Sequence, residues 1–279
     1  RDKPIHQFWH YVAESGTYRR FIGLQHGNMT SKISKGNIEA MPKLVSGQAV
    51  ILAAGRGTRM GSLTETTPKA LLEVAGKTLL EYKLEAMPDN VDEIIIVVGH
   101  LGEMIRKRFG DSYRGKQLLY VEENNPVGGT AHSLWLARDI LRDRFLVMNG
   151  DNIYARSDME TFANSAKDEW AVLVKEKTDI PTGRVVVDGN GFVTDIVEKN
   201  LHSGESGFAN TGLYALDMRI FDYPQVSKSP SSGELGLPQT MIQAVKNINI
   251  RAVPAAFWIE IKTPEDLKKA EEILKSAKQ

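Results

Sequence analysis

The stretch Gln48-Ala-Val-Ile-Leu-Ala-Ala-Gly55-Arg-Gly57-Thr-Arg-Met60 joins an apolar run to a glycine-rich loop. Both alternating positions of the run carry apolar side chains, which is typical of a strand buried on both faces of a parallel sheet. The two glycines that follow leave backbone N–H groups able to surround a phosphate. The stretch therefore predicts a buried strand that leads into a phosphate-binding loop.

Strands and helices alternate on the C-terminal side of this loop. Apolar, β-branched runs at 93–98, 118–121 and 144–148 are separated by helical patterns at 78–88, 101–109 and 129–142. Such alternation indicates right-handed βαβ crossovers. It predicts an α/β fold in which helices flank a doubly wound, mostly parallel, Rossmann-like sheet.

Short strands dominate the pattern after residue 165. We expect strands at 170–175, 183–187, 192–197 and 209–216, and helices at 234–247 and 264–277. The turn Asp188-Gly-Asn-Gly191 lies between two of these strands and predicts a β-hairpin.

The composition excludes several classes of protein. The 279 residues include 35 basic and 35 acidic side chains and no cysteine. The lack of cysteine excludes disulfides, thiolate nucleophiles and iron–sulfur clusters. No apolar stretch approaches the roughly 18 residues of a membrane span, and the N-terminus lacks the apolar core of a secretory signal. We expect a cytoplasmic protein without a membrane partner.

Residues 1–46 differ from the rest of the chain. They hold seven basic and three acidic residues and show no strand alternation. The composition changes between Pro42 and Gly47, so we expect an N-terminal appendage over 1–46 and one main domain over 47–279.

Two familiar phosphate-binding motifs do not fit the glycine-rich loop. The dinucleotide pattern G-x-G-x-x-G requires a glycine where Met60 stands, and a Walker A loop ending at Gly76-Lys77-Thr78 requires one where Leu71 stands. Arg59 in the loop and Lys69 ten residues later still supply two cations for a bound triphosphate.

The string G-x-G-T-R-M at 55–60, followed by Pro68-Lys69, resembles the signature of the sugar-1-phosphate nucleotidylyltransferases. The resemblance extends from about residue 48 to residue 274. It implies the nucleotide-diphospho-sugar transferase type of fold, a part in nucleotide-sugar biosynthesis, and a nucleoside triphosphate and a sugar 1-phosphate as partners. A nucleic-acid partner is not expected, and formation of a homo-oligomer stays open.

The resemblance also implies roles for individual residues. Asn149-Gly-Asp151 and Trp258-Ile-Glu260 resemble segments that carry magnesium ligands, so Asp151 and Glu260 are the expected Mg²⁺ ligands. The expected nucleotide-binding residues are Leu52, Ala54, Gly55, Gly57, Thr58, Glu123, Asn124, Gly129 and Thr130. The expected contacts to the sugar phosphate are Gly183, Glu198, Lys199 and Asn210.

The implied reaction needs no covalent intermediate. An oxygen of the sugar phosphate attacks the α-phosphorus of the triphosphate in line and displaces pyrophosphate, provided that both anions are held together and their charge is offset. Magnesium suits this chemistry because it accepts carboxylate and phosphate oxygens as ligands. The expected catalytic residues are Arg59, Lys69, Asp151 and Lys199.

Some positions depart from the family pattern. Glu260 stands where aspartate is usual and Lys262 where glycine is usual, which puts the metal geometry in question. The glutamine that reads the base falls on Glu123 or Asn124, and Asn200 replaces a proline. Neither the base nor the sugar can therefore be assigned.

Two other functions stay open. A CTP-dependent cytidylyltransferase for phosphocholine or inositol phosphate would share the loop and Asp151, whereas a catalytically silent nucleotide-sugar-binding relative would explain Glu260 and Lys262. Residues 1–46 resemble, on few positions, the end of a DNA-recognition domain from type I restriction specificity subunits. A fused remnant or a packing arm is the preferred interpretation of this segment, because 46 residues bury little core.

Overall fold

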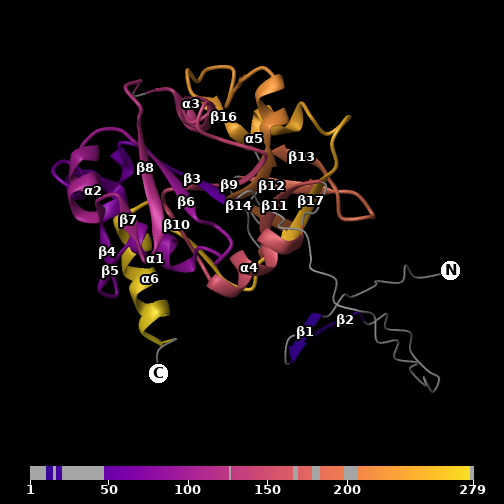
Figure 1. Ribbon diagram of the computed structural model, residues 1–279, viewed down its shortest axis with the longest axis horizontal. Helices are drawn as coiled ribbons and strands as arrows, with labels where there is room; N and C mark the ends of the chain where they lie inside the picture. The colour runs from indigo at the N-terminus through magenta and orange to yellow at the C-terminus, as the bar shows by residue number, and fades with distance from the viewer. Residues whose placement is uncertain are drawn as a thin grey trace. The chain divides into compact units, whose positions relative to one another are not determined.

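The computed structural model describes residues 11–14, 17–20, 47–125, 127–165, 169–177, 183–197 and 207–276 (Figure 1). The chain divides into two compact units, Arg1–Pro42 and Lys43–Gln279. In the first unit, β1 (Tyr11–Glu14) and β2 (Thr17–Arg20) pair as antiparallel strands. The sequence predicts no strand there, because these residues do not alternate in hydrophobicity; strand pairing uses backbone groups and does not require alternation.

The second unit is organised around one large sheet. Its strand order is β13-β12-β14-β9-β3-β6-β8-β7, and β11 and β17 extend it from β14. The four strands β8, β6, β3 and β9 are parallel, whereas β14 pairs antiparallel with β9. The strands are β3 (Gln48–Ala53), β6 (Glu93–Val98), β7 (Ser112–Tyr113), β8 (Lys116–Glu122), β9 (Arg144–Asn149), β11 (Trp170–Lys177), β12 (Arg184–Val187), β13 (Val193–Val197), β14 (Gly207–Asp217) and β17 (Ile250–Pro254).

Helices cover both faces of this sheet. Ile51 and Ile96 pack into a core covered by α1, α2 and α4, whereas Val50 and Val97 pack into a second core covered by α3 and α5. This alternation explains why the strands are apolar on both sides, and the predicted doubly wound α/β fold is confirmed. The helices are α1 (Leu79–Ala86), α2 (Gly102–Phe109), α3 (Gly129–Leu136), α4 (Arg156–Ser165), α5 (Leu237–Ile242) and α6 (Pro264–Ser276).

Two helices are shorter than the sequence predicts. The pattern predicts a helix over 129–142, but α3 ends at Leu136 and the chain continues in tighter turns, in which the N–H of Ile140 donates to the carbonyl of Ala137. The segment after α5 behaves likewise, since the N–H of Asn247 donates to the carbonyl of Ala244. Such i→i+3 turns still bury one face, so the apolar spacing resembles that of a longer helix.

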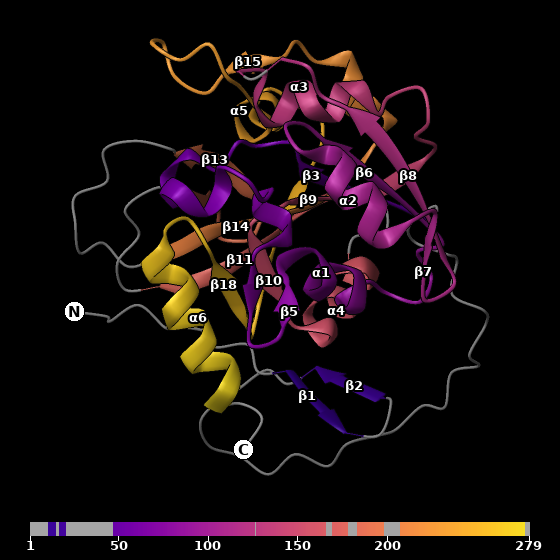
Figure 2. The ribbon, with the colours of Figure 1, turned by 90° about the vertical axis from the view of Figure 1, so that its left-hand side faces the viewer.

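A small antiparallel ribbon joins two distant parts of the chain. It consists of β10 (Asn152–Tyr154) and β18 (Trp258–Glu260), and it lies beside α1 and α6 (Figure 2). Ile153 and Ile261 anchor it in a third apolar core with Met60 and Leu79. The remaining elements are η1 (Thr58–Thr64), η2 (Lys69–Leu71), β4 (Glu73–Val74), β5 (Lys77–Thr78), η3 (Met218–Asp222), β15 (Val226–Ser227) and β16 (Leu235–Gly236).

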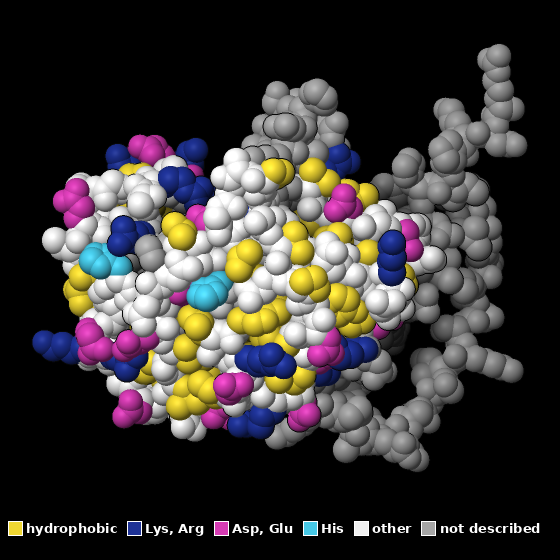
Figure 3. All heavy atoms as spheres, turned by 90° about the horizontal axis from the view of Figure 1, so that it is seen from above, with side chains coloured by type: hydrophobic (Ala, Val, Ile, Leu, Met, Phe, Trp, Pro, Cys, Tyr) yellow, Lys and Arg dark blue, Asp and Glu magenta, His cyan; other side chains and the backbone are white. Residues whose placement is uncertain are grey.

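Acidic and basic side chains are interspersed on the face of the described residues that Figure 3 shows. No helix in the described ranges is both long and apolar enough to span a lipid bilayer.

Candidate nucleotide and metal site

The glycine-rich loop leaves β3 and winds into the 3₁₀ helix η1. Gly57 adopts a φ of 67°, and a Cβ there would lie 3.2 Å from the Cβ of Lys69. Glycine therefore lets the loop fold back onto Lys69. The hydroxyl of Thr64 donates to the carbonyl of Gly57 over 3.0 Å and fixes this return.

The predicted loop residues differ in what they present to a ligand. Gly55, Thr58 and Arg59 are exposed, and open space surrounds the position of a Cβ on Gly55. Ala54 is half-buried, whereas the side chain of Leu52 packs into the core. Leu52 can therefore meet a nucleotide only through its backbone.

Asp151 lies beside this loop, two residues after the end of β9. The N–H of Gly150 donates to the carbonyl of Leu52 over 2.9 Å, and a Cβ on Gly150 would lie 2.7 Å from that oxygen. Only glycine allows the turn to approach the end of β3 so closely. The ammonium of Lys69 lies 2.8 Å from Oδ2 of Asp151, so two of the predicted catalytic residues form an ion pair across 82 positions of sequence.

Lysines set the charge state of Asp151. Burial alone would raise the pKa of its carboxyl, but the ammonium of Lys69, together with the charge of Lys83, lowers that pKa overall. Asp151 is therefore ionised at neutral pH, as a carboxylate ligand of a divalent metal must be.

Lys83 is an ionisable group near the site that the sequence pattern did not single out. It is completely buried on α1, and its ammonium donates to the carbonyls of Asn152 over 2.6 Å and Leu79 over 3.3 Å. Burial lowers its pKa to about 7, against the opposing effect of Asp151. The spacing did hold a signal, because Lys83 lies one helical turn after Leu79 on the apolar face of the helix.

The β10–β18 ribbon carries Glu260 to the same place. Glu260 lies opposite Asn152, and the N–H of Ile261 donates to the carbonyl of Asp151 over 2.9 Å. The indole N–H of Trp258 donates to Oδ1 of Asn152 over 2.9 Å and reinforces the ribbon. The two predicted metal ligands therefore come from segments that pair directly.

The donor set would suit a magnesium ion held through few protein ligands. Within the described ranges, no group of three or more histidine, aspartate or glutamate side chains could hold a metal. Asp151 and Glu260 are partly exposed carboxylates, and Mg²⁺ commonly takes one or two carboxylates and completes its shell with phosphate oxygens and water. Each carboxylate already pairs with a lysine, Asp151 with Lys69 and Glu260 with Lys262.

Two of the predicted sugar contacts, Asn210 on β14 and Gly183 before β12, lie together where these two strands pair. The N–H of Asn210 donates to the carbonyl of Gly183 over 2.6 Å, and its side-chain amide donates to the hydroxyl of Tyr214 over 2.9 Å. Gly212, two residues on, packs against the side chain of Asn149, which brings this strand to the turn that holds Asp151. Glu198, Lys199 and Asn200 lie outside the described residues.

Glu123 and Asn124, the two candidates for base recognition, differ in environment. The side chain of Glu123 is only 5% exposed. Its carboxylate accepts the N–H of Asn125 over 2.7 Å and the hydroxyl of Ser133 over 3.4 Å, and it lies 3.4 Å from the imidazole of His132. Asn124 is exposed. Glu123 is thus bound by its own loop and by α3, and Asn124 is the more accessible of the two.

Gly129 and Thr130 have structural partners. A Cβ on Gly129 would clash with the backbone of Leu235 in β16. The hydroxyl of Thr130 accepts the N–H of Leu237 over 2.9 Å, at the start of α5. These contacts attach α3 to α5 and do not bear on whether either residue also meets a nucleotide.

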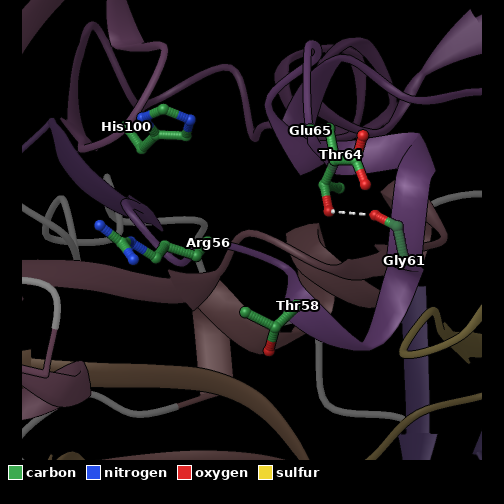
Figure 4. Close-up of a pocket in the computed structure, with 6 residues that line it drawn as sticks. All are labelled: Arg56, Thr58, Gly61, Thr64, Glu65 and His100. Atoms are coloured by element: carbon green, nitrogen blue, oxygen red, sulfur yellow. Dashed lines mark hydrogen bonds between the residues drawn. The ribbon is translucent and has the colours of Figure 1, made fainter.

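A hollow of about 400 Å³ opens beside the glycine-rich loop. Figure 4 shows Arg56 and His100 on one side of it and Thr64 and Glu65 on the other. His100 follows β6, so the hollow lies between the loops that leave two adjacent parallel strands. Open α/β sheets bind ligands at this edge.

Comparisons with known proteins agree with this geometry. The model of the nucleotidyl transferase family matches residues 48–276. The chain belongs to this family. The predicted superfamily of sugar-1-phosphate nucleotidyltransferases, and with it the predicted class of enzyme, is therefore confirmed.

Two relatives illustrate the similarity of this family member to known proteins. It is 32% identical to the bifunctional protein GlmU of Methanocaldococcus jannaschii over 81% of this chain and 54% of that protein. It is 30% identical to the UTP–glucose-1-phosphate uridylyltransferase AglF of Haloferax volcanii over 81% of this chain and 96% of that one. The chain thus spans about half the length of the first relative and nearly all of the second.

A solved structure shows the same fold. It is that of a Bacillus anthracis protein assigned as a glucose-1-phosphate thymidylyltransferase, in complex with sucrose. The TM-score is 0.69 at 28% identity, and the match covers 81% of this chain and 94% of that one.

Proposed function

We propose that this chain joins a sugar 1-phosphate to a nucleoside triphosphate, giving a nucleotide sugar and pyrophosphate. The observation that carries the proposal is the turn at Asp151, which holds an ionised carboxylate 2.8 Å from Lys69 beside the glycine-rich loop. A triphosphate in this place would meet backbone N–H groups, the guanidinium of Arg59 and the ammonium of Lys69.

Different residues bind the two anionic substrates, the triphosphate and the sugar phosphate. Arg59 and Lys69 bind the triphosphate and fix its α-phosphorus, while Lys199 binds the phosphate of the sugar and Asn210 with Gly183 lines the sugar. The attacking phosphate oxygen then forms the new P–O bond as the bond to pyrophosphate breaks, and the electron pair leaves with pyrophosphate. Positioning and charge supply the catalysis, and no proton has to move.

Asp151 and Glu260 are the residues that would hold Mg²⁺. When bound, this ion would neutralise the charge that develops on the phosphate oxygens. The chemistry of the two carboxylates supports this assignment, as does their position on paired segments.

The relatives suggest which substrates to test first. AglF acts on UTP and glucose 1-phosphate, and the structurally similar protein is assigned to thymidylyl transfer on glucose 1-phosphate. We therefore propose UTP or dTTP with a hexose 1-phosphate as the substrate pair, and nucleotide-sugar biosynthesis in the cytoplasm as the setting.

The test is release of pyrophosphate with Mg²⁺ across UTP, dTTP, ATP, GTP and CTP, each with hexose 1-phosphates, phosphocholine and inositol phosphate. We expect a signal with a hexose 1-phosphate that disappears when EDTA is added. A signal with CTP and an alcohol phosphate alone would replace the proposal with the cytidylyltransferase alternative. If a folded protein binds the triphosphate but releases no pyrophosphate with any pair, the result would support a catalytically silent relative that binds nucleotide sugars.

A further inference from the structure

Lys262 occupies a fixed position next to the second carboxylate. Its ammonium lies 2.7 Å from Oε2 of Glu260, two residues earlier on the same segment. Its backbone N–H and that of Thr263 both donate to Oδ2 of Asp266, over 2.9 and 2.8 Å, where α6 begins. The backbone from which Lys262 extends is therefore held at both ends, by the ribbon and by the cap of α6.

The charge of Lys262 reaches other groups in the site. Burial would raise the pKa of the Asp151 carboxyl, and Lys262 adds to the larger effects of Lys69 and Lys83 that lower it overall. Lys177 lies on the other side, with its ammonium 4.4 Å from the ring centre of Trp258. Burial lowers the pKa of Lys177, and Lys262 adds to that effect while Glu260 opposes it. Lys69 and Lys262 thus each pair with one of the two carboxylates, and Lys177 adds a third positive charge that interacts with Glu260.

This arrangement creates a competition. A divalent cation that binds Oε2 of Glu260 has to displace an ammonium already bound there. Once displaced, that ammonium would still extend from a backbone fixed at the start of α6, within reach of phosphates bound beside Glu260. A lysine ammonium is a compact point charge and a good partner for phosphate oxygens.

We propose that Lys262 acts as a built-in cation of the phosphate site, which weakens divalent-cation binding at Glu260 and binds phosphate oxygens of the substrate itself. The inference rests on the proposed function, because it takes Asp151 and Glu260 to mark the metal and triphosphate site. It assigns a role to the residue that stands where the family pattern has glycine.

Metal binding is the first test and needs no turnover. Mn²⁺ is titrated into the full chain and free Mn²⁺ is followed by EPR, for the wild type and for Lys262→Ala, Lys262→Arg and the control Lys268→Ala. We expect Lys262→Ala to bind Mn²⁺ about tenfold more tightly, while Lys262→Arg and Lys268→Ala stay at the wild-type affinity. Lys268 is a matched control because it is an exposed lysine on the adjoining helix.

The second test measures phosphate binding without metal. Pyrophosphate is titrated calorimetrically into the same variants in EDTA, and we expect Lys262→Ala to bind it about tenfold more weakly than the wild type and Lys268→Ala. Circular dichroism checks that each variant is folded.

Several results would overturn the proposal. These are an unchanged Mn²⁺ affinity in Lys262→Ala, an equal increase in Lys268→Ala, no Mn²⁺ binding by any variant, or an unchanged affinity for pyrophosphate. Both readouts are binding constants and need no turnover. A failure to find any substrate pair would therefore contradict the proposed function but would leave the affinities for Mn²⁺ and pyrophosphate as a separate test.

Discussion

Asp151 and Glu260 are both carboxylates paired with a lysine, yet the fold holds them in different ways. The partners Lys69 and Asp151 are 82 residues apart, and the side chain of Lys69 is only 12% exposed. Glu260 and Lys262 are two residues apart on one segment, and the side chain of Lys262 is 31% exposed. The first pair joins Lys69 on η2 to the turn after β9, and its lysine is the less exposed of the two. The second pair can open through side-chain rotation alone.

This difference predicts unequal roles. A charge in a water-poor place with fixed partners stabilises a transition state better than one that solvent screens. The Lys69–Asp151 pair should therefore dominate catalysis, while the Lys262–Glu260 pair should adjust metal and phosphate binding.

Asp151→Asn should have the largest effect. We expect a loss of about 10² to 10³ in kcat/KM, since one preorganised charge contact at the reacting phosphates is removed. Pyrophosphate release measures it, and Asp89→Asn is the matched control because Asp89 is an exposed carboxylate paired with Arg156. Near-full activity of Asp151→Asn would show that Asp151 takes no part in catalysis.

Lys69→Ala should follow, with a loss on the order of 10² in kcat/KM. The variant removes both the triphosphate contact and the partner of Asp151. Lys77→Ala is the control, because Lys77 also pairs with a carboxylate, that of Glu85, but is more exposed. Equal rates for the two variants would contradict the proposed role of the long-range pair.

Glu260→Gln should cost much less, about fivefold in kcat/KM, because the amide keeps an oxygen that can face the metal and a charge screened by solvent contributes about 1 kcal/mol. The same assay is used, with Glu271→Gln as the control, since Glu271 pairs with Lys275 on α6. A loss as large as that of Asp151→Asn would show that the two carboxylates contribute equally to catalysis, and would contradict the unequal roles proposed for them.

Lys83→Met should change the pH dependence of stability. The pKa of Lys83 is about 7 in the folded chain and near its ordinary value of 10.5 when unfolded, so the unfolded state binds more protons between these values. The free energy of unfolding of the wild type should therefore gain about 1.4 kcal/mol per pH unit from this group above pH 7.

Urea unfolding at pH 7 and pH 9 tests this effect. The gain should be absent from Lys83→Met and present in the surface variant Lys77→Met. Identical pH profiles for the wild type and Lys83→Met would show that Lys83 is not buried as a titrating amine.

Much of the fold could be predicted because the parallel strands are short and apolar throughout. The runs at Gln48–Ala53 and Glu93–Val98 have no plausible solvent-facing side, so a sheet covered on both faces was the simple solution. The β10–β18 ribbon could not be foreseen in the same way. Three-residue strands carry no periodicity, and their pairing joins segments more than 100 residues apart.

The candidate site shows the same division. Lys69, Asp151 and the glycine-rich loop follow from a contiguous motif and a strand end, and the structure brings them together. The ion pair between Glu260 and Lys262 depends on rotamers at the end of β18, which spacing alone does not specify. Glu123 looked equivalent to Asn124 in sequence, and only the contacts with Asn125 and Ser133 distinguish them.

The most direct measurement is a crystal structure of the full chain with Mg²⁺ and a non-hydrolysable analogue of UTP. The account predicts that the triphosphate lies over residues 55–59 with Lys69 on its phosphates and the metal on Asp151. A triphosphate bound elsewhere, with Asp151 still paired to Lys69 and free of metal, would contradict it.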